Sequence, residues 1–297
     1  MVAQKVKTNQ ESNLSPLLVV VGPTASGKSQ LAMEIARKFN GEIICADSRT
    51  VYKGMDIGTA KPSTQDQQEV NHHIIDIVKP DEVFTAASFK RLALQAITDI
   101  TNRGKLPILV GGTGLYIDGV IFDFAFLPPV ETEERARLQQ LSVAQLQQRL
   151  IKQNIAMPEN KNNPRHLIRA IETNGAVPVK GNLRGNTLVL GIEKSKQELT
   201  QIIENRTKEM IKNGLKQEVK TLAILYGWDS PGLSAVGYRE WHEKNDEKAI
   251  EQSIIKNSLN YAKRQRTWFR RNPHIAWIKN SAEVTELVQS FIQQNKT

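Results

Sequence analysis

The residues best suited to chemistry lie near the start of the chain, in the run Gly22-Pro23-Thr24-Ala25-Ser26-Gly27-Lys28-Ser29. This run has the G-x-x-x-x-G-K-[ST] spacing of a phosphate-binding loop (P-loop). Its glycines allow backbone N–H groups to converge on one anion, Lys28 adds a full positive charge, and Ser29 offers a hydroxyl to Mg²⁺. The run therefore predicts a site for a polyphosphate with a metal, without saying which polyphosphate it is.

The elements around this run must hold it at the edge of a sheet. An apolar stretch, 17–21, precedes it and a helical pattern, 29–39, follows it, which is the strand, loop and helix context of a P-loop. Further strands are predicted at 42–46, 72–78 and 106–110, with a helix at 85–102 between the last two. Alternating strands and helices predict an α/β fold, a P-loop NTPase-like parallel sheet flanked by helices.

Two more polar positions follow predicted strands and should open on the same crevice. Asp47 comes after strand 42–46, where it could bind metal, accept a proton or cap the next turn. Thr113 lies in the glycine turn 111–114, which could let a ligand approach the backbone or could be a tight strand-to-helix turn. For His72 and His73 we expect structural hydrogen bonds, because no further Cys or His lies nearby to complete a metal site.

Composition narrows the partners and the compartment. The 297 residues carry a formal charge of +9, with a pI of about 9.5, which favours an anionic partner, nucleic acid ahead of a membrane surface. The single cysteine, Cys45, excludes a disulfide and a Cys-rich zinc module and indicates a reducing, cytoplasmic setting. No apolar run approaches the ~18 residues of a membrane helix, and residues 1–13 are expected to form a disordered tail.

The pattern changes after residue 122. A hinge-like segment, 124–129, and helices at 131–150 and 163–173 predict a small helical insertion over 123–184. A strand at 188–192 returns the chain to a core made of 14–122 and 185–297. Helices are then expected at 197–213 and 250–272; the second mixes many basic residues with Tyr261, Trp268 and Phe269. Such a helix suits RNA, although a packed helix with a solvated basic face has the same pattern.

Taken together, these stretches resemble the tRNA dimethylallyltransferase family. The resemblance runs in the family's order over about 17–272, with the blocks 47–62 and 263–270 as its specific parts. One departure is Thr50, where the family usually has Gln before the Val-Tyr pair. The residues that carry the resemblance are Gly22–Ser29, Asp47-Ser48-Arg49, the run 51–62, the run 72–76, Gly111-Gly112-Thr113-Gly114-Leu115-Tyr116, Gly237-Tyr238-Arg239-Glu240 and Lys263-Arg264-Gln265-Arg266-Thr267-Trp268-Phe269-Arg270.

The resemblance implies transfer of a dimethylallyl group from dimethylallyl diphosphate to the exocyclic amine of the adenosine just 3′ of a tRNA anticodon. Residues Gly22–Ser29, with Arg206 and a Mg²⁺ on Ser29, would then bind the diphosphate. Asp47, Thr113 and Lys28 would be the catalytic residues: Asp47 would accept the amine proton, and Thr113 would hydrogen-bond the diphosphate near the breaking bond.

The resemblance also implies a tRNA surface, an anticodon stem-loop clasped by the insertion, and a flipped target base. A cytoplasmic monomer without membrane contact is expected. The implied tRNA-binding residues are Asp47, Ser48, Arg49, Thr50, Thr113, Arg135, Arg165, His166, Leu167, Ile168, Arg169, Ser234, Ala235, Val236, Gly237, Tyr238, Arg239, Lys263, Arg264, Gln265, Arg266, Thr267, Trp268, Phe269 and Arg270.

Three other functions remain open from the residues. A P-loop kinase or NTPase would use the same loop for ATP. An adenylate isopentenyltransferase would act on free AMP, ADP or ATP, but the block 263–270 and the insertion favour polymeric RNA. A non-catalytic RNA-binding protein would not need Lys28, Ser29, Asp47 and Thr113 together.

Overall fold

The structure is a computed structural model that describes residues 14–127, 132–242, 246–278 and 281–295. The chain divides into two compact units, here called the P-loop unit (up to Phe122 and again from Leu183) and the insertion unit (Asp123–Asn182). The expected tail, 1–13, and the end of the expected hinge, 128–129, lie outside the described residues. Within the described residues, no helix is long and apolar enough to cross a membrane.

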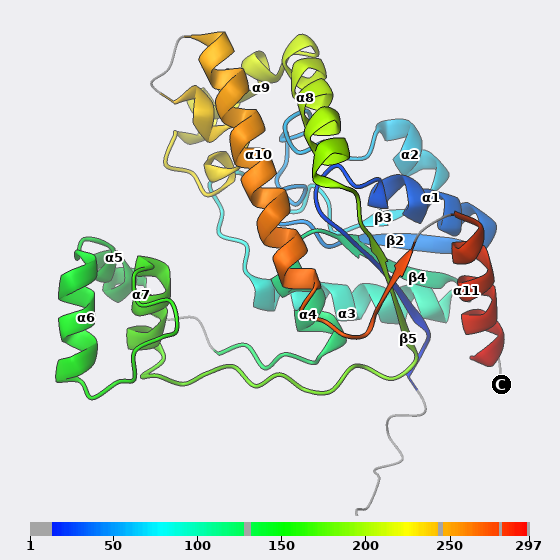
Figure 1. Cartoon of the computed structure of the whole chain (residues 1–297), viewed down its shortest axis with the longest axis horizontal. Coiled ribbons are helices and arrows are strands. Elements are labelled where there is room, and N and C mark those ends of the chain that lie inside the picture. Colours follow the sequence, from blue (N-terminus) through cyan, green and yellow to red (C-terminus); the bar gives the residue numbers. More distant parts are fainter. Residues whose placement is uncertain (1–13, 128–131, 243–245, 279–280, 296–297) are drawn as a thin grey trace, which may run out of the picture. The chain divides into compact units, whose positions relative to one another are not determined.

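A six-stranded sheet forms the centre of the P-loop unit (Figure 1), in the order β3-β2-β4-β1-β5-β6, and every paired neighbour is parallel. In the register, Val19 of β1 lies opposite Leu109 of β4 and Val189 of β5. The expected parallel α/β fold is therefore confirmed. The strands are β1 (Leu17–Val21), β2 (Gly41–Cys45), β3 (His72–His73), β4 (Leu106–Gly111), β5 (Thr187–Ile192) and β6 (Ile275–Ile278).

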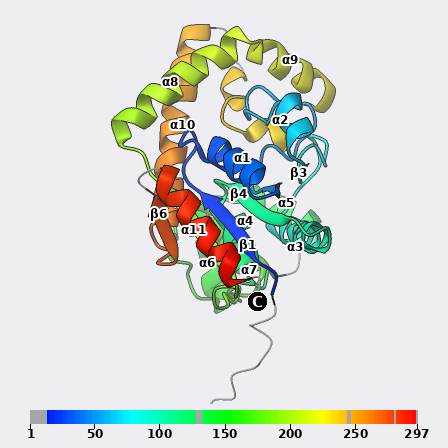
Figure 2. The same cartoon turned by 90° about the vertical axis from the view of Figure 1, so that its right-hand side faces the viewer.

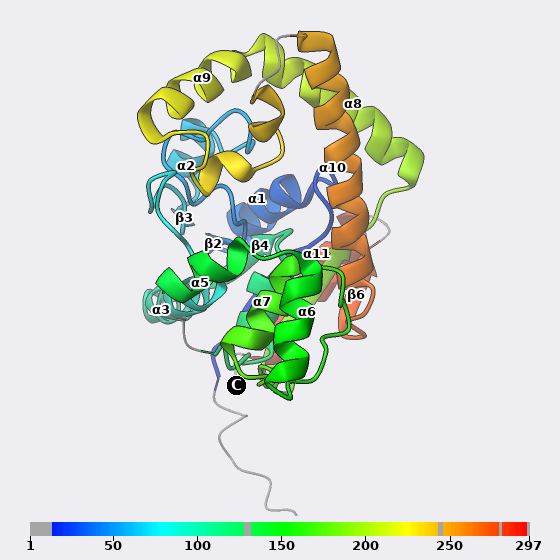
Figure 3. The same ribbon diagram turned by 90° about the vertical axis from the view of Figure 1, so that its left-hand side faces the viewer.

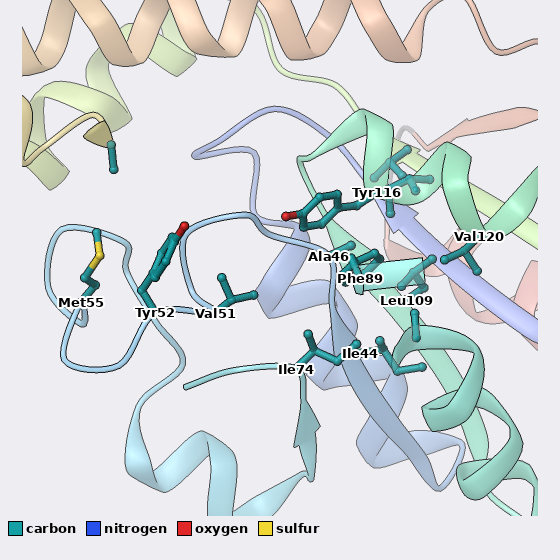
Figure 4. Packing of buried hydrophobic residues seen from close by; sticks show 14 of the residues in the cluster. Ile44, Ala46, Val51, Tyr52, Met55, Ile74, Phe89, Leu109, Tyr116 and Val120 are labelled. Carbon is teal, nitrogen blue, oxygen red and sulfur yellow. The ribbon is translucent and has the colours of Figure 1, made fainter. Parts of the chain in front are cut away.

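The alternation of side chains along β1 builds two apolar layers. Leu18 and Val20 pack with α1 (Lys28–Lys38) and α11 (Ser281–Gln294), which flank the sheet in Figure 2. Val19 and its alternate neighbours join the layer of α3 (Ala86–Asn102) and α4 (Gly114–Ile121). In that layer the Phe89 and Tyr116 rings stack with their centroids 4.3 Å apart (Figure 4). Burial on both faces explains why the β1 sequence is continuously apolar.

Local signals set most helix boundaries. Asn40, at φ +50°, takes the left-handed conformation that follows α1. Thr85 accepts a hydrogen bond from the Ser88 N–H at the start of α3, and Ser195 forms a capping box at the start of α8 (Lys196–Lys212). Asp246 caps α10 (Glu247–Phe269). Figure 3 shows α8 and α10 together with α9 (Leu215–Tyr226).

Some elements differ from the sequence prediction. The strand expected over 72–78 is wrong beyond His73, because Ile74 and Asp76 have positive φ angles of 63° and 53° that break the extended chain. Its histidines do make structural hydrogen bonds, His72 with the Val70 carbonyl and His73 with Glu42. The helices α2 (Thr64–Glu69), α9 and α11 and strand β6 were not predicted individually.

The insertion unit has a hydrophobic core of its own. Leu138, Leu146 and Leu167 are fully buried in it, supplied by α5 (Thr132–Gln139), α6 (Val143–Lys152) and α7 (Pro164–Glu172). The continuous helix expected over 131–150 is wrong, because the capping box that begins at Ser142 starts a new helix. An antiparallel bridge between Ala125 and Val179 joins the two ends of the described part of this unit.

Candidate active site

The P-loop connects β1 to α1 and turns sharply before the helix. Ala25 and Gly27 have φ angles of 64° and 92°, and α1 begins at Lys28. The first N–H groups of a helix have no partner within the helix, and the helix dipole adds partial positive charge there. This end of α1 is therefore suited to an anion, as the sequence predicts.

A cavity of about 590 Å³ lies beside this loop. It is lined by the P-loop, by the residues that follow β2, and by Arg206 of α8. One cavity thus joins three segments that are far apart in the sequence, each of which was expected to contribute to the site. Its polar lining includes Thr24, Lys28, Ser29, Asp47, Thr50, Thr59, Lys194 and Arg206.

Positive charge in this cavity is partly buried. Burial lowers the pKa of Lys28 to about 8, against the opposing effect of Asp47 and with a smaller contribution from Arg206. Burial also lowers the pKa of Arg206, and Asp47 again opposes it. The Arg206 guanidinium donates to the Thr24 hydroxyl at 3.4 Å, and Lys28 Nζ donates to the Pro23 carbonyl at 3.3 Å. Lys28 and Arg206 thus lie close enough to Asp47 for its negative charge to affect their pKa values.

Asp47 has one occupied and one open oxygen. Its Oδ1 accepts the Arg49 N–H at 2.8 Å, which is the turn-capping contact considered from the sequence. Among the described residues, no hydrogen bond or ion pair is found for the other oxygen. Because Asp47 also lines the cavity, capping and chemistry are compatible roles for the same carboxylate.

Thr113 lies next to the Asp47 turn. Its hydroxyl accepts the Ser48 N–H at 3.1 Å, and its own N–H donates to the Ala46 carbonyl at 3.3 Å. Burial raises the pKa of Tyr261, on α10, to about 12; Asp47 raises it further, and a hydrogen bond with the Thr113 side chain lowers it. The structure therefore brings together the two strand ends that the sequence assigned to one crevice.

The glycine turn 111–114 serves a purpose that neither sequence interpretation included. A Cβ on Gly112 would lie 2.1 Å from Gln265 Nε2, and one on Gly114 would lie 2.3 Å from Trp268 Cδ1. The missing side chains thus let α10 pack directly against the turn.

Helix α10 presents different residues on its different faces. Ala262, Gln265 and Phe269 are buried. A groove of about 510 Å³, whose lining includes residues of both α8 and α10, contains Lys196, Lys263, Arg266, Thr267 and Arg270. Glu193, just after β5, pairs with Arg266 at 2.9 Å and with Arg270 at 2.6 Å.

The two remaining aromatic residues of α10 lie on the side of the glycine turn 111–114. Tyr261 hydrogen-bonds the Thr113 side chain, and a Cβ on Gly114 would meet Trp268. Arg264 lies over the Tyr261 ring, 5.7 Å from its centroid, and Trp268 is 39% exposed. Cation–π contact of this kind holds a guanidinium at the surface without neutralising it. The basic segment 263–270 therefore contains buried residues, groove residues and exposed residues in alternation.

The loop 234–239 is mostly structural. Arg49 donates to the Pro231 carbonyl and to the Ser234 hydroxyl, which ties this loop to the Asp47 turn. Ala235 and Tyr238 are buried, and the Tyr238 hydroxyl donates to Glu218 at 2.6 Å. Of the implied tRNA contacts here, the exposed side chains are Ser234 and Arg239; Val236 is half-buried and Gly237 is buried backbone.

The implied tRNA residues of the insertion unit have mixed surroundings. Arg135 and Arg169 both pair with Glu172, whose side chain is buried. Arg165 and His166 are exposed, whereas Leu167 and Ile168 belong to the core of this unit. Any contact made by these two apolar residues would involve their backbone.

Thr50, the position that departs from the family pattern, is 6% exposed and lines the cavity. Its hydroxyl has no hydrogen-bond partner among the described residues. Lys194, which also lines the cavity, and Tyr261, which reaches Thr113, were not named as site residues from the sequence. Lys194 comes two residues after β5, as Asp47 comes two residues after β2, so the same strand-end rule could have identified it. Tyr261 was visible as an aromatic residue of the basic helix, but its contact with Thr113 depends on how α10 packs.

The oxygen groups present fit a magnesium ion that keeps part of its water. Ser29 and Asp47 line the same cavity. Among the described residues no group of three or more His, Cys, Asp or Glu side chains could hold a metal. Mg²⁺ usually binds through one or two protein oxygens together with water and substrate phosphates, so this donor set suits it.

Comparison with known proteins places this geometry in a family. A family model described as IPP transferase matches residues 50–272. The tRNA dimethylallyltransferase of Anoxybacillus flavithermus is 40% identical over 278 residues, covering 88% of this chain and 89% of that protein. That of Bacillus velezensis is 38% identical over 283 residues, covering 88% and 90%.

Solved structures of related enzymes have the same fold as this chain. The tRNA isopentenylpyrophosphate transferase of Bacillus halodurans superposes with a TM-score of 0.74 and 33% identity, covering 95% of this chain and 98% of that one. A eukaryotic dimethylallyltransferase acting on tRNA gives a TM-score of 0.77 at 24% identity, covering 96% and 81%, which shows the shared fold. The chain therefore belongs to the IPP transferase family, the family of the tRNA dimethylallyltransferases.

Proposed function

We propose that this protein transfers a dimethylallyl group from dimethylallyl diphosphate to the exocyclic amine of the adenosine just 3′ of a tRNA anticodon. The observation that carries the proposal is the cavity in which a P-loop, Arg206 and a carboxylate with one open oxygen meet. Cations and backbone N–H groups suit a leaving diphosphate, and the carboxylate suits an attacking amine.

In this reaction the allylic C–O bond breaks while the adenine nitrogen forms a new N–C bond. The electron pair of the broken bond stays on the diphosphate, so negative charge grows beside Lys28 and Arg206. Their positive charges stabilise this growth more in the transition state than in the ground state, which is what accelerates the step.

Asp47 takes up the proton that the amine loses. The Arg49 N–H holds one carboxylate oxygen, which orients the other toward the cavity for the amine. An adenine amine is a weak nucleophile, so alignment with the allylic carbon contributes as much as basicity does.

Thr113 hydrogen-bonds the diphosphate near the bond that breaks. Its hydroxyl accepts from the Ser48 N–H and also hydrogen-bonds Tyr261, so donation to the diphosphate would replace the Tyr261 contact. The Ser29 hydroxyl would hold a Mg²⁺, which would neutralise part of the diphosphate charge.

We assign RNA binding to the exposed basic side chains of α10 and of the insertion unit. These side chains would contact phosphates of the anticodon stem-loop, while the target base leaves its stack to enter the cavity. We further propose that the protein acts in the cytoplasm as a monomer.

The test is an acceptor assay. The protein is incubated with labelled dimethylallyl diphosphate and Mg²⁺ in the presence of unmodified tRNA, AMP or ATP, and label is counted on each acceptor. We expect label on tRNA alone and loss of it without Mg²⁺. Label on AMP but not on tRNA would identify an adenylate isopentenyltransferase. In a parallel reaction with γ-labelled ATP, transfer of the labelled phosphate to an acceptor would identify a kinase.

A further inference from the structure

Gln265 lies in the middle of the basic run of α10, yet it is 5% exposed. Its neighbours on the same helix face, Ala262 and Phe269, are 3% and 1% exposed. Burying an amide among apolar groups is unfavourable unless its hydrogen bonds are made. The contacts of Gln265 therefore identify what this amide does.

Both ends of the Gln265 amide contact the active-site loops. Oε1 accepts the Thr24 N–H of the P-loop at 2.8 Å, and Nε2 donates to the Gly112 carbonyl at 2.9 Å. A reversed amide would set N–H against N–H and oxygen against oxygen, so only this orientation satisfies both contacts.

The two contacted loops are those that flank the cleft. Thr24 belongs to the diphosphate loop and also receives the Arg206 guanidinium, while Gly112 directly precedes Thr113. The Gln265 amide thus sets the spacing between the loop for the leaving group and the residue assigned to the breaking bond. The missing Cβ of Gly112 is what admits the amide at this distance.

We propose that Gln265 is a positioning residue that holds the P-loop and the Thr113 turn in register and connects them to the RNA-binding helix. It contributes to diphosphate binding and to turnover without touching RNA through its side chain. The expected effect on turnover rests on the proposed function. The expected effect on diphosphate binding does not, so a binding measurement tests the role of Gln265 by itself.

Two substitutions separate this role from simple packing. Gln265→Met keeps the length of the side chain but removes both hydrogen bonds. Gln265→Glu keeps an acceptor for the Thr24 N–H and turns an ionised carboxylate toward the Gly112 carbonyl. Gln252→Met is the matched control, because Gln252 is an exposed glutamine on the same helix.

The measurements are Mg²⁺-diphosphate binding by calorimetry, tRNA binding, and steady-state kcat and KM for the donor. For Gln265→Met we expect diphosphate affinity and kcat to fall about ten-fold, because the Thr24 N–H and the Gly112 carbonyl both lose the partner that positions them. tRNA affinity should stay within about two-fold. The control should match the unmodified protein throughout.

The pH dependence of diphosphate binding in the Gln265→Glu protein distinguishes a hydrogen-bonding role from a role in packing. When the introduced carboxyl is protonated it can donate to the Gly112 carbonyl and restore the original pair of contacts. Its diphosphate affinity relative to the unmodified protein should therefore rise as pH falls, because burial raises the pKa of such a carboxyl.

Three results would overturn the inference: unchanged diphosphate affinity in a folded Gln265→Met protein, loss of tRNA binding with normal diphosphate binding, or a flat pH response in Gln265→Glu. Should Gln265→Met melt at a much lower temperature, the Gln265→Glu pH response decides. Absence of prenyl transfer in the unmodified protein would refute the proposed function but leave the diphosphate comparison intact.

Discussion

The two carboxylate oxygens of Asp47 have different surroundings, and substitutions can test the role of each oxygen separately. One oxygen fixes the turn through the Arg49 N–H, and the other is open in the cavity. Substitutions that affect only one of these functions should therefore have different kinetic effects.

Asp47→Asn should keep the turn and lose the proton acceptor. We expect kcat to fall about 100-fold, the usual contribution of a general base, while tRNA affinity changes less than about two-fold. Asp47→Ala removes the turn contact as well and should melt at a lower temperature. Single-turnover kinetics and tRNA binding measure these effects, and an equal loss of binding and turnover would instead mean that Asp47 positions the RNA.

The lowered pKa of Lys28 should make diphosphate binding depend on pH. Burial lowers its pKa to about 8, so the free protein carries the charge below that pH and loses it above. Diphosphate affinity should fall about ten-fold between pH 7 and pH 9 relative to Lys28→Arg, which stays charged throughout. Calorimetry on both proteins cancels the ionisation of diphosphate itself, and a constant ratio would exclude Lys28 as the titrating group.

At the scale of single elements, α10 shows where prediction from sequence reached its limit. Its helical pattern and basic charge could be read directly, because periodicity and composition are local properties. The inward position of Gln265 could not, since it depends on Gly112 and on the P-loop far away in the sequence. The P-loop itself was predictable because its strand, turn and helix are contiguous.

The exposed basic residues of α10 should set the salt dependence of tRNA binding. Replacing Lys263, Arg264 and Arg270 together with Gln should weaken binding and lower the slope of log affinity against log salt by about 2 units. Lys248→Gln, ~22 Å further along the same helix, is the control. Filter binding over a range of salt concentrations measures the slope, and an unchanged value would show that this helix does not contact phosphates.

Glu193 competes with phosphate for two of the arginines of α10. It pairs with Arg266 and Arg270, and all three side chains are partly exposed. Glu193→Gln should therefore raise tRNA affinity about three-fold at low salt and leave Mg²⁺-diphosphate binding unchanged. A drop in tRNA affinity would show that Glu193 orients these side chains instead of neutralising them.

The whole molecule consists of two units with separate cores. The sequence indicated both units, because the strand and helix alternation stops after residue 122 and returns near residue 188. The insertion helices were less predictable: one capping box at Ser142 splits a pattern that looks continuous. Boundaries set by a single side-chain contact are hard to obtain from periodicity alone.

The insertion unit should be removable. The chain leaves and re-enters the P-loop unit at adjacent points, since the Arg184 N–H donates to the Ile121 carbonyl at 2.7 Å. Replacing 123–182 by a short Gly/Ser linker should leave diphosphate affinity within about two-fold and lower tRNA affinity ten-fold or more, about 1.4 kcal/mol. Calorimetry and filter binding give the two values, and loss of both would show that the units fold as one.

The contact between Thr24 and Gln265 also has a consequence for biosynthesis. The two residues are 241 positions apart, so at ~5–20 residues per second the P-loop emerges from the ribosome about 12–48 s before its partner. The P-loop thus waits for one of its contacts long after it has been synthesised. A chain released before α10 carries the P-loop without this partner, and the cleft is complete only after α10 has been made.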